Sequence, residues 1–204
     1  MSNRCPGIFS AHLRTMTHKG ANERATLRNT LLRQRLTLSG VARSAAAQDL
    51  AQTLLSSRAW ADQTIAVYAA IDGEIDLCPF MRALPPSTRL AWPLSHDGGI
   101  MEFRVAHYRD LRPGKYGILE PQNGALLAPD DLDAMLIPGS AFSLDGGRLG
   151  MGGGYYDRYL LRVRPDIPRI GVAYHWQVQE RLPLLPHDIT MTHLATDRAW
   201  IECR

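Results

Sequence analysis

Long apolar runs and closely spaced cysteines are both missing from this sequence of 204 residues. No stretch approaches the ~20 consecutive apolar residues that a membrane-spanning helix needs, and no charged start followed by an apolar segment indicates a signal peptide. The three cysteines, Cys5, Cys78 and Cys203, are far apart. Their spacing fits neither a zinc site nor a disulfide framework, and isolated thiols in a reducing compartment are the simpler interpretation. We therefore expect a cytoplasmic protein that does not contact a membrane.

The composition is that of an ordinary globular protein, with 45% hydrophobic and 21% charged residues. A chain of this length can bury a full hydrophobic core without disulfides or a structural metal. Residues 1–21 show no clear hydrophobic period, and we predict that they form a disordered extension. Residues 22–204 are predicted to form a single domain, because no repeat or low-complexity segment interrupts them.

Positive charge is concentrated near the start of the chain. Residues 1–46 hold eight basic residues against Glu23 alone, a net charge of +7, so the remainder carries −4 in a chain of net charge +3. A nucleic-acid partner, an anionic ligand and a solvated helix face all fit such a segment, and the solvated face is the commonest case. We expect no nucleic-acid partner, because aromatic side chains do not alternate with these arginines and the remainder is acidic.

Apolar segments of two kinds alternate along the chain. Short apolar runs bounded by turns predict buried strands, and longer segments with helical spacing of leucine and alanine predict helices. Strands are predicted at 64–71, 90–94, 101–106, 134–137, 169–174 and 194–200. Helices are predicted from a cap at Asn22 and at 41–58, 76–84, 156–163 and 175–181. This alternation predicts an α/β fold with a mostly parallel sheet covered by helices on both sides.

The most informative part of the sequence is the glycine-rich segment before residue 155. Six glycines lie within nine residues, Gly146 to Gly154, and glycine allows backbone N–H groups to turn inward around a phosphate. The helix expected directly afterwards points its positive end at the same place. The segment lacks the Gly-Lys-Ser/Thr of a Walker loop. It is not a dinucleotide fingerprint either, because Tyr155 stands where glycine or alanine is needed.

Two charged residues flank this glycine cluster. Arg148 can donate a pair of hydrogen bonds to a phosphate, and the alternative is a plain surface charge. Asp157 can hold a hard cation through its oxygen atoms, and the alternative is a carboxylate at a helix start paired with Arg158. The cluster and its flanks together predict a site for a phosphate group and a hard cation.

The sequence resembles the signature of the 5-formyltetrahydrofolate cyclo-ligase family at two neighbouring runs, Pro138–Phe142 and Arg148–Arg158. Weaker similarity extends from about Arg24 to Trp200. The resemblance implies a three-layer αβα sandwich. It also implies an ATP- and magnesium-dependent ligase that converts 5-formyltetrahydrofolate to 5,10-methenyltetrahydrofolate, giving ADP and phosphate. In that reaction the formyl oxygen is phosphorylated, and the folate nitrogen-10 then closes the ring.

The resemblance further implies a role for particular positions. The catalytic residues would be Arg148 and Asp157. ATP would be bound by Arg24, Arg28, Arg148, Leu149, Gly150, Met151, Gly152, Gly153, Gly154, Tyr155 and Tyr156. The folate would be bound by Ala69, Glu74, Met151, Gly152, Gly153, Gly154 and Tyr155. The magnesium ligands would be Asp157 and Asp188, with ATP as co-substrate.

Two positions depart from the family pattern. Arg24 stands where lysine is frequent, which changes the geometry of its hydrogen bonds. Ala69 is smaller than the apolar residue expected there, which predicts a wider pterin pocket. His187 lies next to Asp188, but magnesium prefers oxygen ligands, so we predict a structural role for this histidine.

Other functions compete with the cyclo-ligase. A related enzyme that acts on another pterin or on a thiamine-related compound would share the scaffold, since fold does not fix substrate. The cyclo-ligase is favoured by the joint presence of four charged residues: Glu74, Arg148, Asp157 and Asp188. A structural or partner-binding protein would leave the glycine–tyrosine–aspartate run without a purpose. We expect a monomer whose partners are a small folate and ATP.

Overall fold

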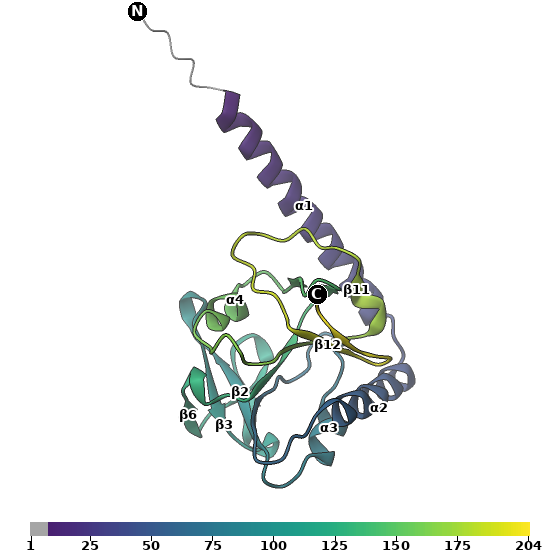
Figure 1. Ribbon diagram of the computed structural model, residues 1–204, viewed down its shortest axis with the longest axis vertical. Helices are drawn as coiled ribbons and strands as arrows, with labels where there is room; N and C mark the ends of the chain where they lie inside the picture. Colours follow the sequence, from purple (N-terminus) through teal and green to yellow (C-terminus); the bar gives the residue numbers. More distant parts are fainter. Residues whose placement is uncertain (1–7) are drawn as a thin grey trace, which may run out of the picture.

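The computed structural model describes the backbone of residues 8–204 and the side chains of residues 22–204, and residues 1–7 lie outside the described part. The helices are α1 (Ile8–Leu36), α2 (Gly40–Ser57), α3 (Cys78–Ala83) and α4 (Tyr155–Leu160). Single 3-10 turns lie at Asp97–Gly99, Tyr108–Asp110, Lys115–Gly117, Pro129–Asp131 and His175–Gln177. Helix α1 extends away from the body of the molecule toward the N-terminus (Figure 1).

A central sheet of eight strands organises the molecule, in the order β13-β12-β10-β7-β1-β2-β3-β6. These strands are β1 (Thr64–Ala66), β2 (Arg89–Ser95), β3 (Met101–Val105), β6 (Ala125–Leu127), β7 (Ala134–Pro138), β10 (Arg169–Ala173), β12 (His193–Thr196) and β13 (Trp200–Glu202). Neighbours are parallel from β12 to β2 and antiparallel at both ends of the sheet. The predicted mostly parallel sheet is therefore confirmed.

Two small sheets complete the fold. One is a hairpin of β4 (Leu111–Pro113) and β5 (Leu119–Pro121). The other joins β8 (Ala141–Ser143), β9 (Arg148–Leu149) and β11 (Val178–Gln179). The sequence analysis did not predict these short strands, because runs of two or three residues are too short to show a hydrophobic period.

Helices cover both faces of the central sheet and bury a separate core on each. On one face, Leu50 and Leu54 of α2 and Phe80 of α3 pack against the sheet. On the other face, Tyr159 and Leu160 of α4 do the same. Side chains alternate along β7: Leu136 belongs to the first core, and its neighbours on either side belong to the second. A strand buried on both faces reads as a continuous apolar run, which is how it was recognised in the sequence.

Some predicted elements differ from the structure. The strand predicted at 194–200 is a hairpin of β12 and β13, because the Thr196 hydroxyl accepts hydrogen bonds from the N–H groups two and three residues further on. The helix predicted at 175–181 is a single 3-10 turn, and the chain then enters β11 to pair with β8. Both departures depend on hydrogen bonds that an apolar pattern does not report.

The first predicted strand and the first predicted helix have other limits in the structure. Strand β1 ends at Ala66, and the chain leaves the sheet as a buried loop after the Val67 N–H has bonded the Ala91 carbonyl. Helix α1 begins at Ile8, so Asn22 is not its N-cap. The disordered extension predicted for residues 1–21 lies partly outside the described residues, and the domain boundary near Asn22 stays a prediction.

Candidate functional site

A cavity of about 580 Å³ opens at the carboxyl ends of β1 and β7. Its walls come from α1, the loop after β1, the ends of β2 and β3, the β4–β5 hairpin, the glycine-rich segment and the loop before β12. Ligands of open α/β sheets bind outside the carboxyl ends of the strands. Every predicted site residue except Leu149 lines this cavity.

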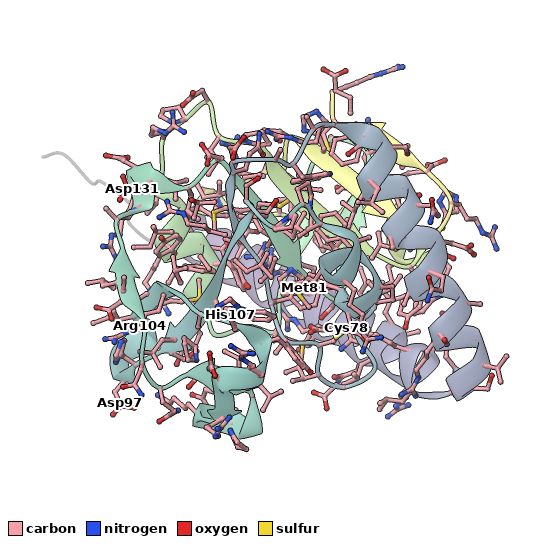
Figure 2. The ribbon with its side chains drawn as sticks, turned by 90° about the horizontal axis from the view of Figure 1, so that it is seen from below. Cys78, Met81, Asp97, Arg104, His107 and Asp131 are labelled. Atoms are coloured by element: carbon pink, nitrogen blue, oxygen red, sulfur yellow. The ribbon has the colours of Figure 1, made fainter. Side chains whose placement is uncertain are left out.

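A second hollow of about 390 Å³ lies on the α3 side of the molecule, next to Cys78, Met81 and His107 (Figure 2). It contains none of the predicted site residues. Burial raises the pKa of the Cys78 thiol to about 11, with a further contribution from Asp76, so the thiol is protonated and unreactive at neutral pH. The larger cavity is therefore the candidate active site.

The glycine-rich segment forms one wall, and two of its glycines that line the cavity adopt a left-handed backbone. Gly152 has φ 99° and Gly154, directly before α4, has φ 67°. A side chain at Gly153 would lie 2.9 Å from the ring of Tyr155. Glycine therefore allows the backbone to face the cavity directly, where a phosphate can approach its N–H groups.

Leu149 points away from the cavity. Its side chain is 1% exposed and packs with Leu31 and Ala141, and its carbonyl accepts a hydrogen bond from the Ser140 N–H. The residue thus anchors the start of the glycine-rich segment in the core. The family resemblance implies that Leu149 is an ATP contact, but the structure places its neighbours, and not Leu149, on the wall of the cavity.

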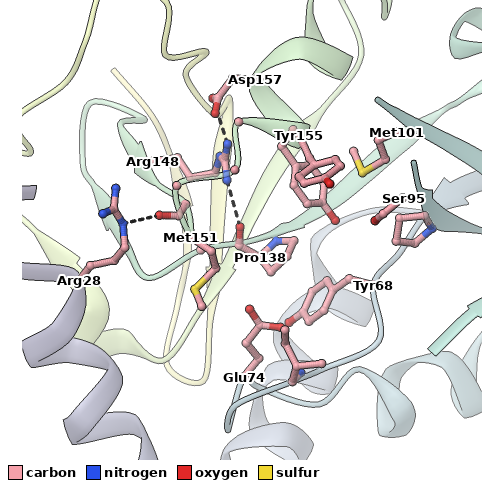
Figure 3. Close-up of a pocket in the computed structure, with 18 of the residues that line it drawn as sticks. Arg28, Tyr68, Glu74, Ser95, Met101, Pro138, Arg148, Met151, Tyr155 and Asp157 are labelled. Atoms are coloured by element: carbon pink, nitrogen blue, oxygen red, sulfur yellow. Dashed lines mark hydrogen bonds and ion pairs between the residues drawn. The ribbon is translucent and has the colours of Figure 1, made fainter. Parts of the chain in front are cut away.

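Arg148 is buried beneath the glycine-rich segment and holds Asp157. Its Nη2 donates to the Asp157 Oδ1 at 2.9 Å, and its Nη1 donates to the Pro138 carbonyl at 3.4 Å (Figure 3). The guanidinium also lies 5.4 Å from the ring centre of Tyr156. Arg158, the alternative partner considered for Asp157, instead donates to the carbonyls of Gly99 and Gly153. Asp157 therefore faces the cavity as part of a buried ion pair.

Arg24 makes a similar pair with Asp188. Its Nη1 lies 2.5 Å from Oδ2 and its Nη2 lies 3.3 Å from Oδ1 of that carboxylate. Burial opposes ionisation of Asp188, but hydrogen bonds from Arg24 and from the Leu185 N–H lower its pKa below the ordinary value. Asp188 is therefore an anion at neutral pH.

Arg28 is the third arginine of the cavity and is only partly satisfied. Its Nε donates to the Gly150 carbonyl at 2.7 Å. Among the described side chains, its two terminal nitrogens have no hydrogen-bond partner. Burial and the neighbouring charge of Arg24 lower the pKa of Arg28, and Asp188 opposes them. A bound anion would relieve this unfavourable charge, so the arrangement suits a phosphate.

Glu74 lies on the opposite side of the cavity from Arg148 and Asp157 (Figure 3). Its side chain is 8% exposed, its Oε2 accepts from the Ile71 N–H at 3.2 Å, and its Oε1 lies 3.9 Å from Nη1 of Arg35. Burial raises the pKa of Glu74 to about 7, although Arg35 and the Ile71 N–H oppose the shift. Tyr68, from the same loop, is fixed by a hydrogen bond to the Ile75 carbonyl.

Several residues that line the cavity were not predicted from the sequence. They share no motif and come from strand ends and loops: Tyr68, Pro93, Ser95, Met101, Tyr116 and Ile118. Tyr116 had the best available signal, since Gly114-Lys-Tyr-Gly117 reads as a turn that could close over a substrate. The structure places it at the tip of the β4–β5 hairpin, with its hydroxyl 3.5 Å from that of Tyr155.

A divalent cation fits this cavity only with help from a ligand. In the part of the chain that the structure describes, no three His, Cys, Asp or Glu side chains gather closely enough to hold a metal. Asp157 and Asp188 supply hard oxygen atoms, which magnesium prefers, and magnesium usually combines one or two carboxylates with phosphate oxygens and water. The two predicted ligands therefore suit a metal that arrives with a nucleotide.

The comparison with known proteins identifies the family. The model of the 5-formyltetrahydrofolate cyclo-ligase family matches residues 20–197. The chain belongs to this family. The 5-formyltetrahydrofolate cyclo-ligase of Escherichia coli (strain K12) is 31% identical over 149 residues, which cover 67% of this chain and 80% of that protein. The family predicted from the sequence is thus confirmed, and with it the ligase class.

Solved structures of cyclo-ligase relatives share the fold. The 5,10-methenyltetrahydrofolate synthetase of Aquifex aeolicus has a TM-score of 0.78 and 34% identity, covering 89% of this chain and 93% of that one. The corresponding enzyme of Mycoplasma pneumoniae has a TM-score of 0.73 and 28% identity, covering 86% and 99%. Among the described residues, no helix has both the length and the apolar character needed to cross a membrane.

Proposed function

We propose that this chain carries out the reaction for which its relatives are named, the ATP-dependent conversion of 5-formyltetrahydrofolate to 5,10-methenyltetrahydrofolate. The observation that carries the proposal is the meeting of two kinds of subsite in one cavity. Three arginines and a glycine-rich backbone line one side, and the buried carboxylate of Glu74 lies on the other. The first set suits triphosphate, and the second suits the N–H groups of a pterin.

ATP binds with its phosphates against the glycine-rich segment. Among the described residues, the two terminal nitrogens of Arg28 have no hydrogen-bond partner, and their N–H groups donate to phosphate oxygens. Arg148 lies at the base of the segment and neutralises the charge that develops during phosphoryl transfer. Transfer of this kind depends on positioning and charge neutralisation, so no nucleophilic side chain is required.

Asp157 and Asp188 are the proposed magnesium ligands. Each carries a negative charge on the cavity wall and is paired with an arginine. A magnesium ion bound with ATP supplies positive charge to the phosphate oxygens. Asp157 and Asp188 would hold the cation through their carboxylate oxygens, and the arginines paired with them would then face the phosphates.

The folate binds across the cavity with its pterin at Glu74. The carboxylate accepts hydrogen bonds from pterin N–H groups, and Tyr68, Met101 and Ile118 provide apolar surface for the rings. Ala69 is buried in the same loop and lines the pocket. The wider pterin pocket expected from its small side chain stays a prediction.

The reaction then proceeds in two balanced steps. The formyl oxygen attacks the γ-phosphorus of ATP, a P–O bond forms, and ADP leaves. Nitrogen-10 of the folate next attacks the activated formyl carbon and loses its proton. The C–O bond to phosphate breaks, and the five-membered ring of the methenyl product is complete. Charge neutralisation by Arg28 and Arg148 stabilises the first step.

The first test is an absorbance assay for the methenyl product with purified protein, 5-formyltetrahydrofolate, ATP and magnesium, each left out in turn. Product is expected only when all components are present. ATP hydrolysis by a folded protein without methenyl product would contradict the proposal and favour a related enzyme with another pterin or thiamine-related substrate. Monomeric state and cytoplasmic location stay predictions from the sequence.

A further inference from the structure

Arg35 is a buried charged residue to which neither the motif nor the reaction assigns a role. Its side chain lies near the end of α1 and the residue is 1% exposed. Residues 24, 28, 31 and 35 are spaced so that they share one face of a helix. Arg24 and Arg28 reach the phosphate side of the cavity from this face. Arg35 continues the same face toward the pterin side.

Arg35 is hydrogen-bonded to the turn that carries Glu74. Its Nε donates to the Asp72 carbonyl at 2.8 Å, and its Nη1 lies 3.9 Å from the Glu74 Oε1. The turn needs a left-handed backbone at Asp72 and at Gly73, with φ 47° and 73°. A side chain at Gly73 would lie 3.3 Å from the Arg35 carbonyl, so the turn packs directly on the helix end. On its other side, the Tyr174 hydroxyl donates to the Gly73 carbonyl at 3.1 Å.

Arg35 is also the cation that faces Glu74. The other groups around this carboxylate are Asp72, which disfavours its charge, and the hydroxyls of Tyr68 and Tyr156, which are neutral at ordinary pH. The buried Nη2 of Arg35 has no hydrogen-bond partner among the described residues. A residue needed only to fasten the turn would not require a full charge at this position, because burying an unpaired charge is costly.

We propose that Arg35 is a positioning residue for the folate, which holds Glu74 at the pterin subsite and joins it to the helix that carries Arg24 and Arg28. The proposal rests on the proposed function and deepens it. Without Arg35, the Glu74 turn loses its bond to α1 and the carboxylate loses its only facing cation among the described residues. Folate binding therefore weakens, while ATP still meets its own arginines.

The test compares Arg35→Met, Arg35→Lys and Arg33→Met in the full-length enzyme. Arg33 is exposed on the same helix and serves as the matched control. Arg35→Met is expected to raise the KM for 5-formyltetrahydrofolate about tenfold, because the Glu74 turn loses its bond to α1 and the carboxylate loses its facing cation. The KM for ATP is expected to stay within about twofold, because Arg24, Arg28 and Arg148 on the phosphate side of the cavity are unchanged. Arg33→Met is expected to match the wild type.

The pH profile separates positioning from simple destabilisation. Ionised Glu74 binds the pterin, so folate affinity falls as the pH drops through the pKa of Glu74, about 7 in the wild type. Loss of Arg35 raises this pKa, and the acid limb of kcat/KM for folate moves to higher pH in Arg35→Met. Arg35→Lys keeps the charge, so the limb stays near its wild-type position while the KM for folate still rises.

Circular dichroism establishes that each variant is folded before its kinetics are compared. If Arg35→Met does not fold, Arg35→Lys decides, because it keeps the buried charge and lacks only the guanidinium geometry. A folded Arg35→Lys with wild-type KM for folate overturns the inference, as does an equal rise in the KM for ATP. A wild-type enzyme that forms no methenyl product contradicts the proposed function itself, and turnover without these selective effects contradicts the role of Arg35 alone.

Discussion

Asp157 and Asp188 face the cavity as partners of arginines, and this pairing shapes what each residue can do. Asp157 bonds Arg148 and Asp188 bonds Arg24, and each ion pair is largely buried. Removing one member of a buried pair leaves an uncompensated charge, which usually costs more than the pair itself contributes. A substitution that keeps shape and hydrogen bonding is therefore more informative than truncation to alanine.

We predict that Asp157→Asn folds normally and loses most of its activity. The asparagine oxygen still accepts the hydrogen bond from Arg148, but it removes the negative charge that a magnesium ion needs. The expected loss in kcat is about 100-fold or more, the range found when one preorganised electrostatic group is lost. Steady-state kinetics over a magnesium titration measure it, with Asp131→Asn as the control because Asp131 is exposed and does not line the cavity. Unchanged kcat and magnesium dependence in Asp157→Asn would refute the metal assignment.

At the scale of elements, the strands buried on both faces of the sheet were the ones predicted best from the sequence. The buried strands β7 and β10 were predicted within one residue of their ends, because short, uninterrupted apolar runs bounded by turns mark central parallel strands. The hairpin of β12 and β13 was read as one strand, since its turn depends on the Thr196 hydroxyl. The strand β11 was missed because a run of two residues is too short to show a hydrophobic period.

The glycine-rich segment is expected to act through its backbone conformation and not through its side chains. We predict that Gly154→Ala lowers kcat/KM at least about tenfold. The variant should also lose ~1–2 kcal/mol of folding stability, which is the cost of a left-handed backbone at alanine. The added methyl group would lie 2.8 Å from Nη1 of Arg158, so this guanidinium, whose Nη2 donates to the Gly153 carbonyl, would have to shift. Thermal unfolding and steady-state kinetics measure the two effects separately.

Gly98→Ala is the matched control for this prediction. Gly98 has φ 71°, close to the 67° of Gly154, and a methyl group there meets no atom within 4 Å. Both variants are expected to lose similar stability, and only Gly154→Ala is expected to lose activity. Equal activity in the two variants would show that the backbone conformation at Gly154 serves stability alone.

At the scale of the whole molecule, the cavity depends on contacts between distant parts of the chain. Arg24 and Asp188 are 164 positions apart, and Arg35 and Asp72 are 37 apart. The sequence analysis named Arg24 and Asp188 separately through the family resemblance but not as partners, and it gave Arg35 no role. No local pattern reports which charges meet after folding. Ser95 and Met101 were missed for the same reason, because a strand prediction does not tell which strand ends border a cavity.

The same long-range contacts predict how far the chain can be shortened from its N-terminal end without loss of activity. Among the described side chains, the contacts of α1 with the cavity start at Arg24, which bonds Asp188 and the Pro183 carbonyl. We predict that deletion of residues 1–21 leaves kcat and both KM values within about twofold of the full chain, because the described contacts of α1 with the cavity lie beyond residue 21 and chain termini usually tolerate removal. Deletion of residues 1–28 removes Arg24 and Arg28 together and is expected to raise the KM for ATP strongly. Methenyl formation by both truncated proteins, with circular dichroism to check their folding, measures the difference. A loss of activity already on deletion of residues 1–21 would show that the extension takes part in folding or catalysis, and equal activity of the two truncations would remove Arg24 and Arg28 from the ATP site.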